Sequence, residues 1–255
     1  MKVLVIGGSG LIGSQVVTNL TELGHDAVPA SPRTGVNAVT GEGVAGAVAG
    51  VDAVVDVSNS PSWADDDVLN FFTTSTRNLL EAERAAGVRH HVVLSIVGAD
   101  RAAESGYMRA KVAQEEVVVE SGSPYSVVRA TQFFEFIGGI ADSFADGDTV
   151  RAPHAAFQPI AAADVALAVT RAATGDPANR VINIAGPEKQ GMDDFIRTRF
   201  AATDDARTVV TDNDARYFGA VLDDRSIVPT DDEDAVVYPT TFSDWLAAQT
   251  PRSAR

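Results

Sequence analysis

Short apolar runs alternate with longer stretches of helical spacing along most of the chain. The short runs have the length and continuity of strands buried on both faces, and they lie at residues 3–6, 27–28, 36–39, 53–57, 91–96, 125–128 and 180–185. Apolar positions with helical spacing cover residues 11–23, 65–86, 104–120 and 163–173. Strands that alternate with helices of this length predict βαβ units. We therefore expect an α/β fold: a doubly wound parallel sheet with helices on both faces.

The pattern changes after Pro187. Two further helices are predicted near residues 193–201 and 242–249, and the stretch between them is rich in Asp and Thr. No linker rich in Pro and Ser and no internal repeat divides the chain. We therefore expect residues 1–186 to form the sheet-containing core, and residues 187–255 to form a small C-terminal cap that is not an independent domain.

A glycine-rich turn follows the first predicted strand and opens the first predicted helix. Gly7, Gly10 and Gly13 have the spacing GxxGxxG. Glycines at such positions allow a tight turn, a close approach of backbone amides to a pyrophosphate, and close packing of helix on strand. Because the context of strand, turn and helix is the one that such a site requires, we favour a dinucleotide site over a turn without a ligand. Its predicted residues are Gly7, Ser9, Gly10, Leu11, Ile12 and Gly13.

The second predicted strand favours NADP over NAD. A cofactor with a free 2′-hydroxyl is usually held by a carboxylate at the end of that strand, about 20 residues after the glycines. The acid in this region, Asp26, stands at the start of the strand, whereas Ser31 and Arg33 follow its end. A hydroxyl and a guanidinium suit a 2′-phosphate. We predict NADP as the cofactor, with NAD as the alternative.

A tyrosine and a lysine share one face of the predicted helix at 104–120. Lysine is scarce in this chain, yet Lys111 follows Tyr107 by four residues, a spacing that brings the two side chains together. A nearby ammonium favours the phenolate and lowers a tyrosine pKa, as general acid–base catalysis requires. Ser95 lies at the carboxyl end of the preceding strand, where open parallel sheets bind ligands. Ser95, Tyr107 and Lys111 are thus the predicted catalytic residues.

This combination resembles the short-chain dehydrogenase/reductase superfamily. Residues 127–134 (VVRATQFF), and Gln158-Pro159-Ile160 before Asp164-Val165-Ala166, most resemble its atypical NmrA-like NAD(P)H-binding branch. The resemblance covers roughly residues 1–200. It implies that Ser95 polarises a substrate carbonyl and that Tyr107 donates a proton. It also implies that Lys111 binds the nicotinamide ribose and lowers the tyrosine pKa.

The resemblance also extends the expected cofactor site beyond the glycine turn. It implies that Ser58 and Asn59 line the cofactor and that the segment from Arg129 to Thr131 passes near the nicotinamide. Several residues with aromatic rings fall near predicted strand ends or in the cap connection, and we leave them open between a substrate pocket and the core: Trp63, Phe133, Phe134, His154 and Phe157. No His, Asp and Glu cluster has metal-ligand spacing, so no metal site is expected.

Composition narrows the possible partners. The chain carries 35 acidic residues against 20 Lys and Arg, a formal net charge of −15. Such a surface repels nucleic-acid phosphates and anionic lipids, so we expect neither nucleic-acid nor membrane partners. The absence of cysteine excludes disulfides, thiolate zinc sites and cysteine nucleophiles. The apolar N-terminal stretch is interrupted by glycines and polar residues, unlike an export signal, and we expect a cytoplasmic location.

The leading interpretation is an NADP-dependent oxidoreductase that transfers a hydride between nicotinamide and a small carbonyl, quinone or conjugated acceptor. The alternative is a non-catalytic NAD(P)-binding redox sensor that reports to a protein partner. A nucleotide-sugar epimerase is a weaker third interpretation, because residues after Pro187 supply little room for a substrate domain. The specific substrate and the oligomeric state are left open at this stage.

Overall fold

A seven-stranded sheet runs through the centre of the chain in the order β14-β9-β5-β4-β3-β1-β2. The computed structural model describes residues 1–249. Every pairing in this sheet is parallel, which confirms the predicted doubly wound α/β fold. The strands are β1 (Lys2–Ile6), β2 (Asp26–Ala30), β3 (Ala53–Asp56), β4 (His91–Ile96), β5 (Tyr125–Ala130), β9 (Val181–Ala185) and β14 (Ala235–Val237).

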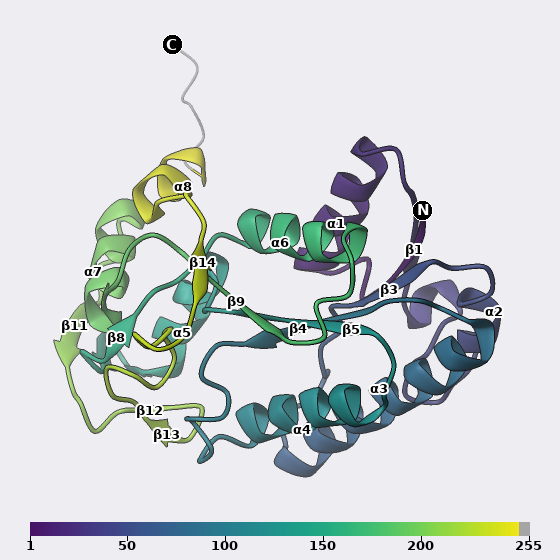
Figure 1. Cartoon of the computed structure of the whole chain (residues 1–255). Coiled ribbons are helices and arrows are strands. Elements are labelled where there is room, and N and C mark those ends of the chain that lie inside the picture. The colour runs from purple at the N-terminus through teal and green to yellow at the C-terminus, as the bar shows by residue number, and fades with distance from the viewer. Residues whose placement is uncertain (250–255) are drawn as a thin grey trace.

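Helices cover both faces of the sheet. Helices α1 (Leu11–Glu22) and α6 (Ala162–Thr174) lie on one face, and α3 (Asp65–Ala86) and α4 (Gly106–Glu120) lie on the other (Figure 1). The short helix α2 (Val44–Ala47) packs beside α3. Both faces of β3 are buried because its apolar residues meet helices on either side. This two-sided burial explains the continuous apolar runs of the sequence.

The strand predicted at residues 36–39 is absent, and that prediction is wrong. The side chain of Asn37 accepts hydrogen bonds from the amides of Val39, at 3.0 Å, and Thr40, at 3.3 Å. The amide of Asn37 in turn donates to the carbonyl of Glu42. A side chain that bonds the following backbone amides turns the chain instead of extending it. As a result, β2 is the edge strand of the sheet.

The order of the strands reverses at β1, and this reversal locates the ligand-binding edge. The strand β2 pairs on one side of β1 and β3 pairs on the other, with Ile6 opposite both Ala30 and Asp56. On the neighbouring strands Ile96 pairs with Ala130. Residues that follow these strands therefore gather along one carboxyl edge, at a topological switch point where such sheets bind ligands.

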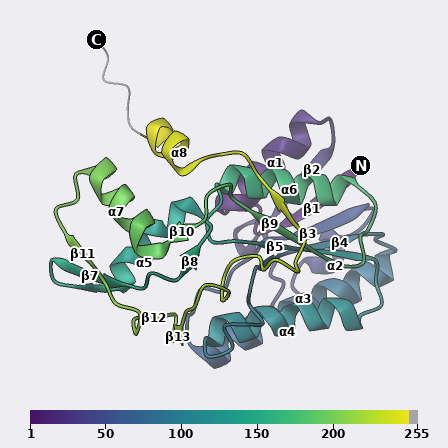
Figure 2. The same cartoon turned by 60° about the vertical axis from the view of Figure 1, so that its left-hand side comes forward.

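A second lobe, the cap, is built at this edge from two segments (Figures 1 and 2). The first lies between β5 and α6 and contains the elements η2 (Phe134–Phe136), α5 (Ile137–Ser143), β6 (Ala145–Asp146), β7 (Thr149–Ala152) and β8 (Ala156–Phe157). The second follows β9 and contains β10 (Gln190–Gly191), α7 (Met192–Thr203), β11 (Thr208–Thr211), β12 (Arg216–Tyr217), β13 (Ala220–Val221) and α8 (Phe242–Gln249). The segments share one apolar core and pair through β7 and β11. The cap therefore draws residues from both sides of the position 186/187, and β14 returns from it to the sheet.

Within residues 1–249, no helix combines the length and the apolar character that a membrane crossing needs.

Candidate functional site

The glycine turn brings the end of β1, the start of α1 and the segment after β3 into close contact. Gly7 has a φ of +79°, and a Cβ at this position would lie 2.8 Å from the carbonyl oxygen of Val57. A Cβ on Gly13 would overlap the carbonyl oxygen of Gly7. The amide of Gly10 donates to that same oxygen at 2.9 Å. Side chains at these positions would push the helix away from the strand, so the glycines are required by packing as well as by any ligand.

The first turn of α1 presents free amides at this edge. Gly10 is the N-cap, no side chain caps the helix, and its first turn has no acidic residue. The amides of Leu11, Ile12 and Gly13 have no intrahelical acceptors, as expected for the first residues of a helix. Unpaired amides and the positive end of the helix dipole attract anions. The turn therefore fits the pyrophosphate of a dinucleotide, with the exposed Ser9 beside it.

The end of β2 offers Arg33 next to this turn. The amide of Gly7 donates to the carbonyl of Ala30 at 3.0 Å, which holds β2 against the glycines. The helical turn η1 (Pro32–Thr34) follows, and the hydroxyl of Thr34 accepts a hydrogen bond from the amide of Ser31. Arg33 is exposed and has no ion pair or hydrogen bond to the residues that the structure describes. Asp26 lies at the opposite end of the strand.

The segment after β3 connects the glycine turn to the predicted catalytic tyrosine. Asp56 is buried, and its carboxylate accepts hydrogen bonds from the hydroxyl of Ser58, at 2.6 Å, and from its amide, at 3.0 Å. The next side chain, Asn59, accepts a hydrogen bond from the Tyr107 hydroxyl at 2.9 Å. The structure thus bonds Tyr107 to Asn59, the residue after Ser58, whose backbone lies against Gly7, although the tyrosine comes from a different crossover.

Tyr107 lies in the first turn of α4 as a protonated phenol. The helix begins after Ser105, whose hydroxyl accepts a hydrogen bond from the amide of Met108. Burial raises the pKa of Tyr107 to about 12, and the hydrogen bond to Asn59 opposes this shift only partly. The predicted lowering of the tyrosine pKa is therefore wrong in this structure. A phenol with this pKa is protonated at neutral pH, so in this state it can act as a proton donor but not as a base.

Lys111 shares the helix face of Tyr107, but its ammonium is directed elsewhere. It donates to the carbonyl of Leu94, at 2.9 Å, and to the side-chain oxygen of Gln114. The ammonium also lies 4.2 Å from the centroid of the Phe72 ring. Burial lowers the pKa of Lys111 to about 8, against the favourable charges of Asp56 and Glu115. The structure therefore does not bring the ammonium to the phenol oxygen.

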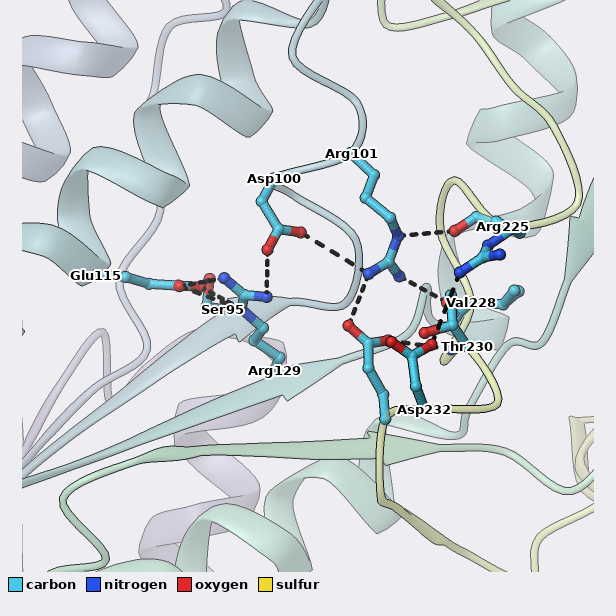
Figure 3. A network of polar contacts seen from close by, with 10 residues as sticks. Ser95, Asp100, Arg101, Glu115, Arg129, Arg225, Val228, Thr230 and Asp232 are labelled. Atoms are coloured by element: carbon cyan, nitrogen blue, oxygen red, sulfur yellow. Dashed lines mark hydrogen bonds and ion pairs between the residues drawn. The ribbon is translucent and has the colours of Figure 1, made fainter.

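Ser95 belongs to a buried ionic network between β4, β5 and α4 (Figure 3). Its hydroxyl donates to the carboxylate of Glu115. The guanidinium of Arg129 donates to both oxygens of that carboxylate, with 2.6 Å for the shortest contact, and to Asp100 at 3.0 Å. Burial disfavours the charge of Arg129, but the partners Glu115 and Asp100 outweigh it and raise its pKa. Ser95 and Arg129 are therefore bonded to Glu115 of α4, whereas the Tyr107 hydroxyl is bonded to Asn59.

The same network also bonds a segment of the cap to the loop after β4. Arg101 donates to the carbonyls of Arg225 and Val228, at 2.8 and 2.7 Å, and pairs with Glu233 at 2.7 Å (Figure 3). At Gly98, with a φ of +76°, a Cβ would overlap the backbone of residue 226. The ionic network therefore joins the sheet to residues 225–233 of the cap.

Thr131 follows β5 at the same edge. It is 1% exposed, and its hydroxyl has no hydrogen-bond partner within the described part of the chain. Buried hydroxyls are nearly always hydrogen-bonded. The unpaired hydroxyl of Thr131 therefore fits a polar group of a bound ligand.

The other predicted residues divide between core and surface. Phe134 and Phe157 are fully buried in the cap core, whereas Trp63 is 61% exposed beside Tyr107. Among the described residues, one group has the geometry of metal ligands, namely His154, Asp193 and Asp194. Asp193 is already paired with His154 and with Arg197, at 2.8 and 2.7 Å, so its charge is compensated without an ion.

Sequence reasoning missed two groups of residues at this site. Glu115 and Gln114 lie on the buried face of α4 together with Lys111. The spacing of these three polar residues in the sequence places them on one helix face, and this pattern could have indicated a buried polar network. Phe218, which stacks on Trp63, lies in a hairpin turn. No periodicity marks that position.

Comparison with known proteins identifies the family. The family model described as NAD(P)H-binding matches residues 7–176, more than half of the chain. The chain belongs to the NAD(P)H-binding family. This result confirms the resemblance found in the sequence, and the matched residues include the glycine turn, Tyr107 and Thr131.

Curated relatives of this NAD(P)H-binding protein include reductases. A (4-alkanoyl-5-oxo-2,5-dihydrofuran-3-yl)methyl phosphate reductase from Streptomyces griseus is 31% identical over 205 residues, 73% of this chain and 68% of the relative. A chloroplastic divinyl chlorophyllide a 8-vinyl-reductase from Cucumis sativus is 26% identical, over 74% of this chain and 53% of the relative. The photosystem II assembly factor Ycf39 from Cyanophora paradoxa is 25% identical, over 59% and 51%. The chain therefore spans about half the length of the last two proteins.

Solved structures agree on the fold. A nucleoside-diphosphate-sugar epimerase from Staphylococcus aureus matches 96% of this chain and 99% of its own, with a TM-score of 0.72 at 15% identity. A dTDP-4-dehydrorhamnose reductase from Bacillus anthracis, in complex with NADP, matches 87% and 89%, with a TM-score of 0.67 at 15% identity. At such identities the likeness concerns the NAD(P)-binding fold and not the substrate.

Proposed function

We propose that this protein is an NADP-dependent reductase of small conjugated acceptors, in which Tyr107 donates the proton. The observation that carries the proposal is the hydrogen bond from the Tyr107 hydroxyl to Asn59, which directly follows the residues that lie against Gly7, namely Val57 and Ser58. This bond joins the phenol to the segment that borders the glycine turn, which supports a role as proton donor. The names of two relatives, a dihydrofuran phosphate reductase and a vinyl reductase, support reduction of a conjugated group.

The residues that would hold the cofactor follow from the free donors of the site. The amides of Leu11, Ile12 and Gly13 would bind the pyrophosphate, and Thr131 would meet another polar group of the ligand. NADPH supplies a hydride when it is bound. Ser58 is fixed by Asp56, so this part of the wall keeps its shape without a ligand.

The protein's own part in the reaction is proton delivery. For a quinone acceptor, one hydride and one proton together give the hydroquinone, and the proton leaves the Tyr107 hydroxyl for a quinone oxygen. The phenolate left behind recovers its proton from water. In the absence of substrate the side-chain oxygen of Asn59 accepts a hydrogen bond from the Tyr107 hydroxyl and so keeps the phenol oriented. In this proposal Ser95, Lys111 and Arg129 are positioning residues, because their polar atoms are bonded within the protein.

The first test is an assay of NADPH oxidation with quinones, enones, aldehydes and ketones. The proposal expects turnover with at least one quinone or enone. It fails if tight NADPH binding is accompanied by no turnover across the panel.

Arg33 provides the test of cofactor choice. The variant Arg33→Ala is expected to weaken NADPH binding about 10-fold or more, because a charge-assisted hydrogen bond to the 2′-phosphate contributes about 1.5–3 kcal/mol. NADH lacks that phosphate, so its dissociation constant should change little. Calorimetric titrations of both nucleotides measure the effect, and Arg180→Ala, at an exposed arginine just before β9, is the control. Equal weakening of both nucleotides would remove Arg33 from the 2′-phosphate site.

One observation favours the second candidate, a non-catalytic sensor of NAD(P). The Ser95 hydroxyl and the Lys111 ammonium, two of the three predicted catalytic groups, are both bonded within the protein. A relative carries the name of an assembly factor, not of an enzyme. This candidate expects cofactor binding without turnover, the result that would reject the reductase.

A further inference from the structure

Three aromatic side chains from three separate segments gather at the Tyr107 ring. Trp63 comes from the loop before α3, Tyr107 from the first turn of α4, and Phe218 from the turn between β12 and β13. The Trp63 and Phe218 rings are stacked, with centroids 5.5 Å apart and planes at 19°. The Trp63 centroid lies 5.4 Å from that of Tyr107. We call Trp63, Tyr107 and Phe218 the aromatic cluster.

The backbone at Phe218 is held in an unusual conformation that presents its ring to this cluster. Phe218 has a φ of +47°, and the following Gly219 has a φ of +92°. Two positive φ values in a two-residue hairpin favour Asn and Gly, and a bulky aromatic at the first position is strained. The strained turn is anchored on both sides. The carboxylate of Glu104 accepts a hydrogen bond from the amide of Val221 at 3.3 Å, and Tyr217 is buried. Strain of this kind concentrates at ligand sites.

The two outer rings remain open to solvent. Trp63 is 61% exposed and Phe218 is 45% exposed, so the cluster is not a completed part of the core. The centroids of the Trp63 and Phe218 rings lie 5.4 and 6.5 Å from that of Tyr107, the proton donor of the proposed reaction. A flat apolar molecule beside the cluster would bury the exposed surface of the two outer rings, and aromatic contacts of this kind are favourable beyond the area they bury.

The cations beside the cluster are already bonded. Arg109 donates to Asp65, at 2.7 Å, and to the carbonyl of Ala103. Arg216 donates to the carbonyl of Gly219 at 2.8 Å. Because these guanidinium groups are engaged, the cluster suits an uncharged ring system better than a phosphate or a sugar nucleotide.

We propose that Trp63 and Phe218 are the specificity-determining residues of the site, and that they bind the flat ring system of an uncharged polycyclic acceptor whose oxygen faces Tyr107. This inference rests on the proposed reductase function. It adds a substrate class and assigns a role to the β12–β13 turn.

The test compares a polycyclic quinone with a single-ring quinone. The variants are Phe218→Asn, which keeps a residue that tolerates positive φ but removes the ring, and Trp63→Leu. For 9,10-phenanthrenequinone we expect KM to rise about 10-fold with kcat within twofold, and for 1,4-benzoquinone we expect little change in KM. Leu23→Ala, an equally exposed apolar residue at the end of α1, is the control. Unchanged KM for phenanthrenequinone in both variants, or equal rises for both quinones, would overturn the inference.

A binding measurement separates failure of this inference from failure of the proposed function. Trp63 and Trp245 are the two tryptophans of the chain, so Trp245→Phe leaves Trp63 as the reporter. We expect saturable quenching of its fluorescence by phenanthrenequinone, with at least fivefold weaker binding after Phe218→Asn, whether or not the quinone is reduced. Quenching that is not saturable would reject the binding site even if the protein reduces other acceptors.

Discussion

Replacing Tyr107 with phenylalanine is expected to lower kcat at least about 100-fold, because general acid catalysis by a positioned side chain typically contributes about 10²–10⁴-fold. The substitution removes the proton that the proposed reaction delivers and the hydrogen bond to Asn59, but it keeps the ring that packs against Phe72. Steady-state kinetics with a quinone acceptor measure the change. NADPH affinity should stay within about twofold of the original protein, since the phenol is not part of the glycine turn. Undiminished kcat would exclude Tyr107 as the proton donor.

The pH profile of the same reaction distinguishes a raised pKa of Tyr107 from a lowered one. With its pKa raised to about 12 by burial, the phenol stays protonated from pH 6 to 9, so its ionisation should not reduce kcat in that range. A pKa lowered towards neutrality by Lys111 would instead make kcat fall as the pH rises above that value. Because Lys111 itself has a pKa lowered to about 8 by burial, the profile is also measured in Lys111→Met. A decline near neutral pH in the unsubstituted protein, well below the range in which Lys111 titrates, would contradict the protonated phenol, and loss of that decline in the variant would identify Lys111 as its cause.

Removing the charge of Glu115 is expected to produce the largest loss of stability. The variant Glu115→Gln leaves Arg129, which is 9% exposed, with Asp100 as its remaining carboxylate partner. Breaking a buried ion pair by neutralising one partner typically costs about 3–5 kcal/mol. For a chain of this size that corresponds to a Tm lower by roughly 6–20 °C. Denaturant unfolding and thermal melts measure the two quantities.

Two further variants control this prediction. Arg89→Gln breaks the pair with Asp52 at 2.6 Å, but Arg89 is 73% exposed, so its cost should stay below about 1 kcal/mol. The double variant Glu115→Leu with Arg129→Met removes both charges and should be less destabilised than the sum of the single variants. If the double variant instead loses as much stability as the two single variants together, Glu115 and Arg129 (Figure 3) are not energetically coupled.

The sequence predicted the elements where local signals and packing agree. Helix α3 begins with Asp65 and is followed by Gly87 with a φ of +72°, so charge at one end and a left-handed glycine at the other define its bounds. The strand β4 was predicted at its observed limits because its apolar residues are buried on both faces of the sheet. The strand predicted at residues 36–39 failed because one side chain, Asn37, provides a local alternative for the backbone.

The candidate site was predictable as a set of positions more than as a set of contacts. Helical spacing correctly placed Tyr107 and Lys111 on one face of α4, but it carries no information on Phe72 and Leu94, which come from other elements and bind the ammonium. Likewise, Ser95 and Arg129 lie side by side in register on β4 and β5. Their role in an ionic network depends on Glu115, twenty residues beyond Ser95. The orientation of a polar side chain depends on such tertiary partners. They lie far away along the chain, so they cannot be identified from a single sequence.

The most direct test of the account is a titration of the isotopically labelled protein with NADPH, followed by amide chemical shifts. The account predicts saturable shifts that are largest at the amides of Gly10, Leu11, Ile12 and Gly13, because these groups form the uncapped start of α1. Saturable shifts confined to other parts of the molecule, or no saturable shifts at all, would contradict it.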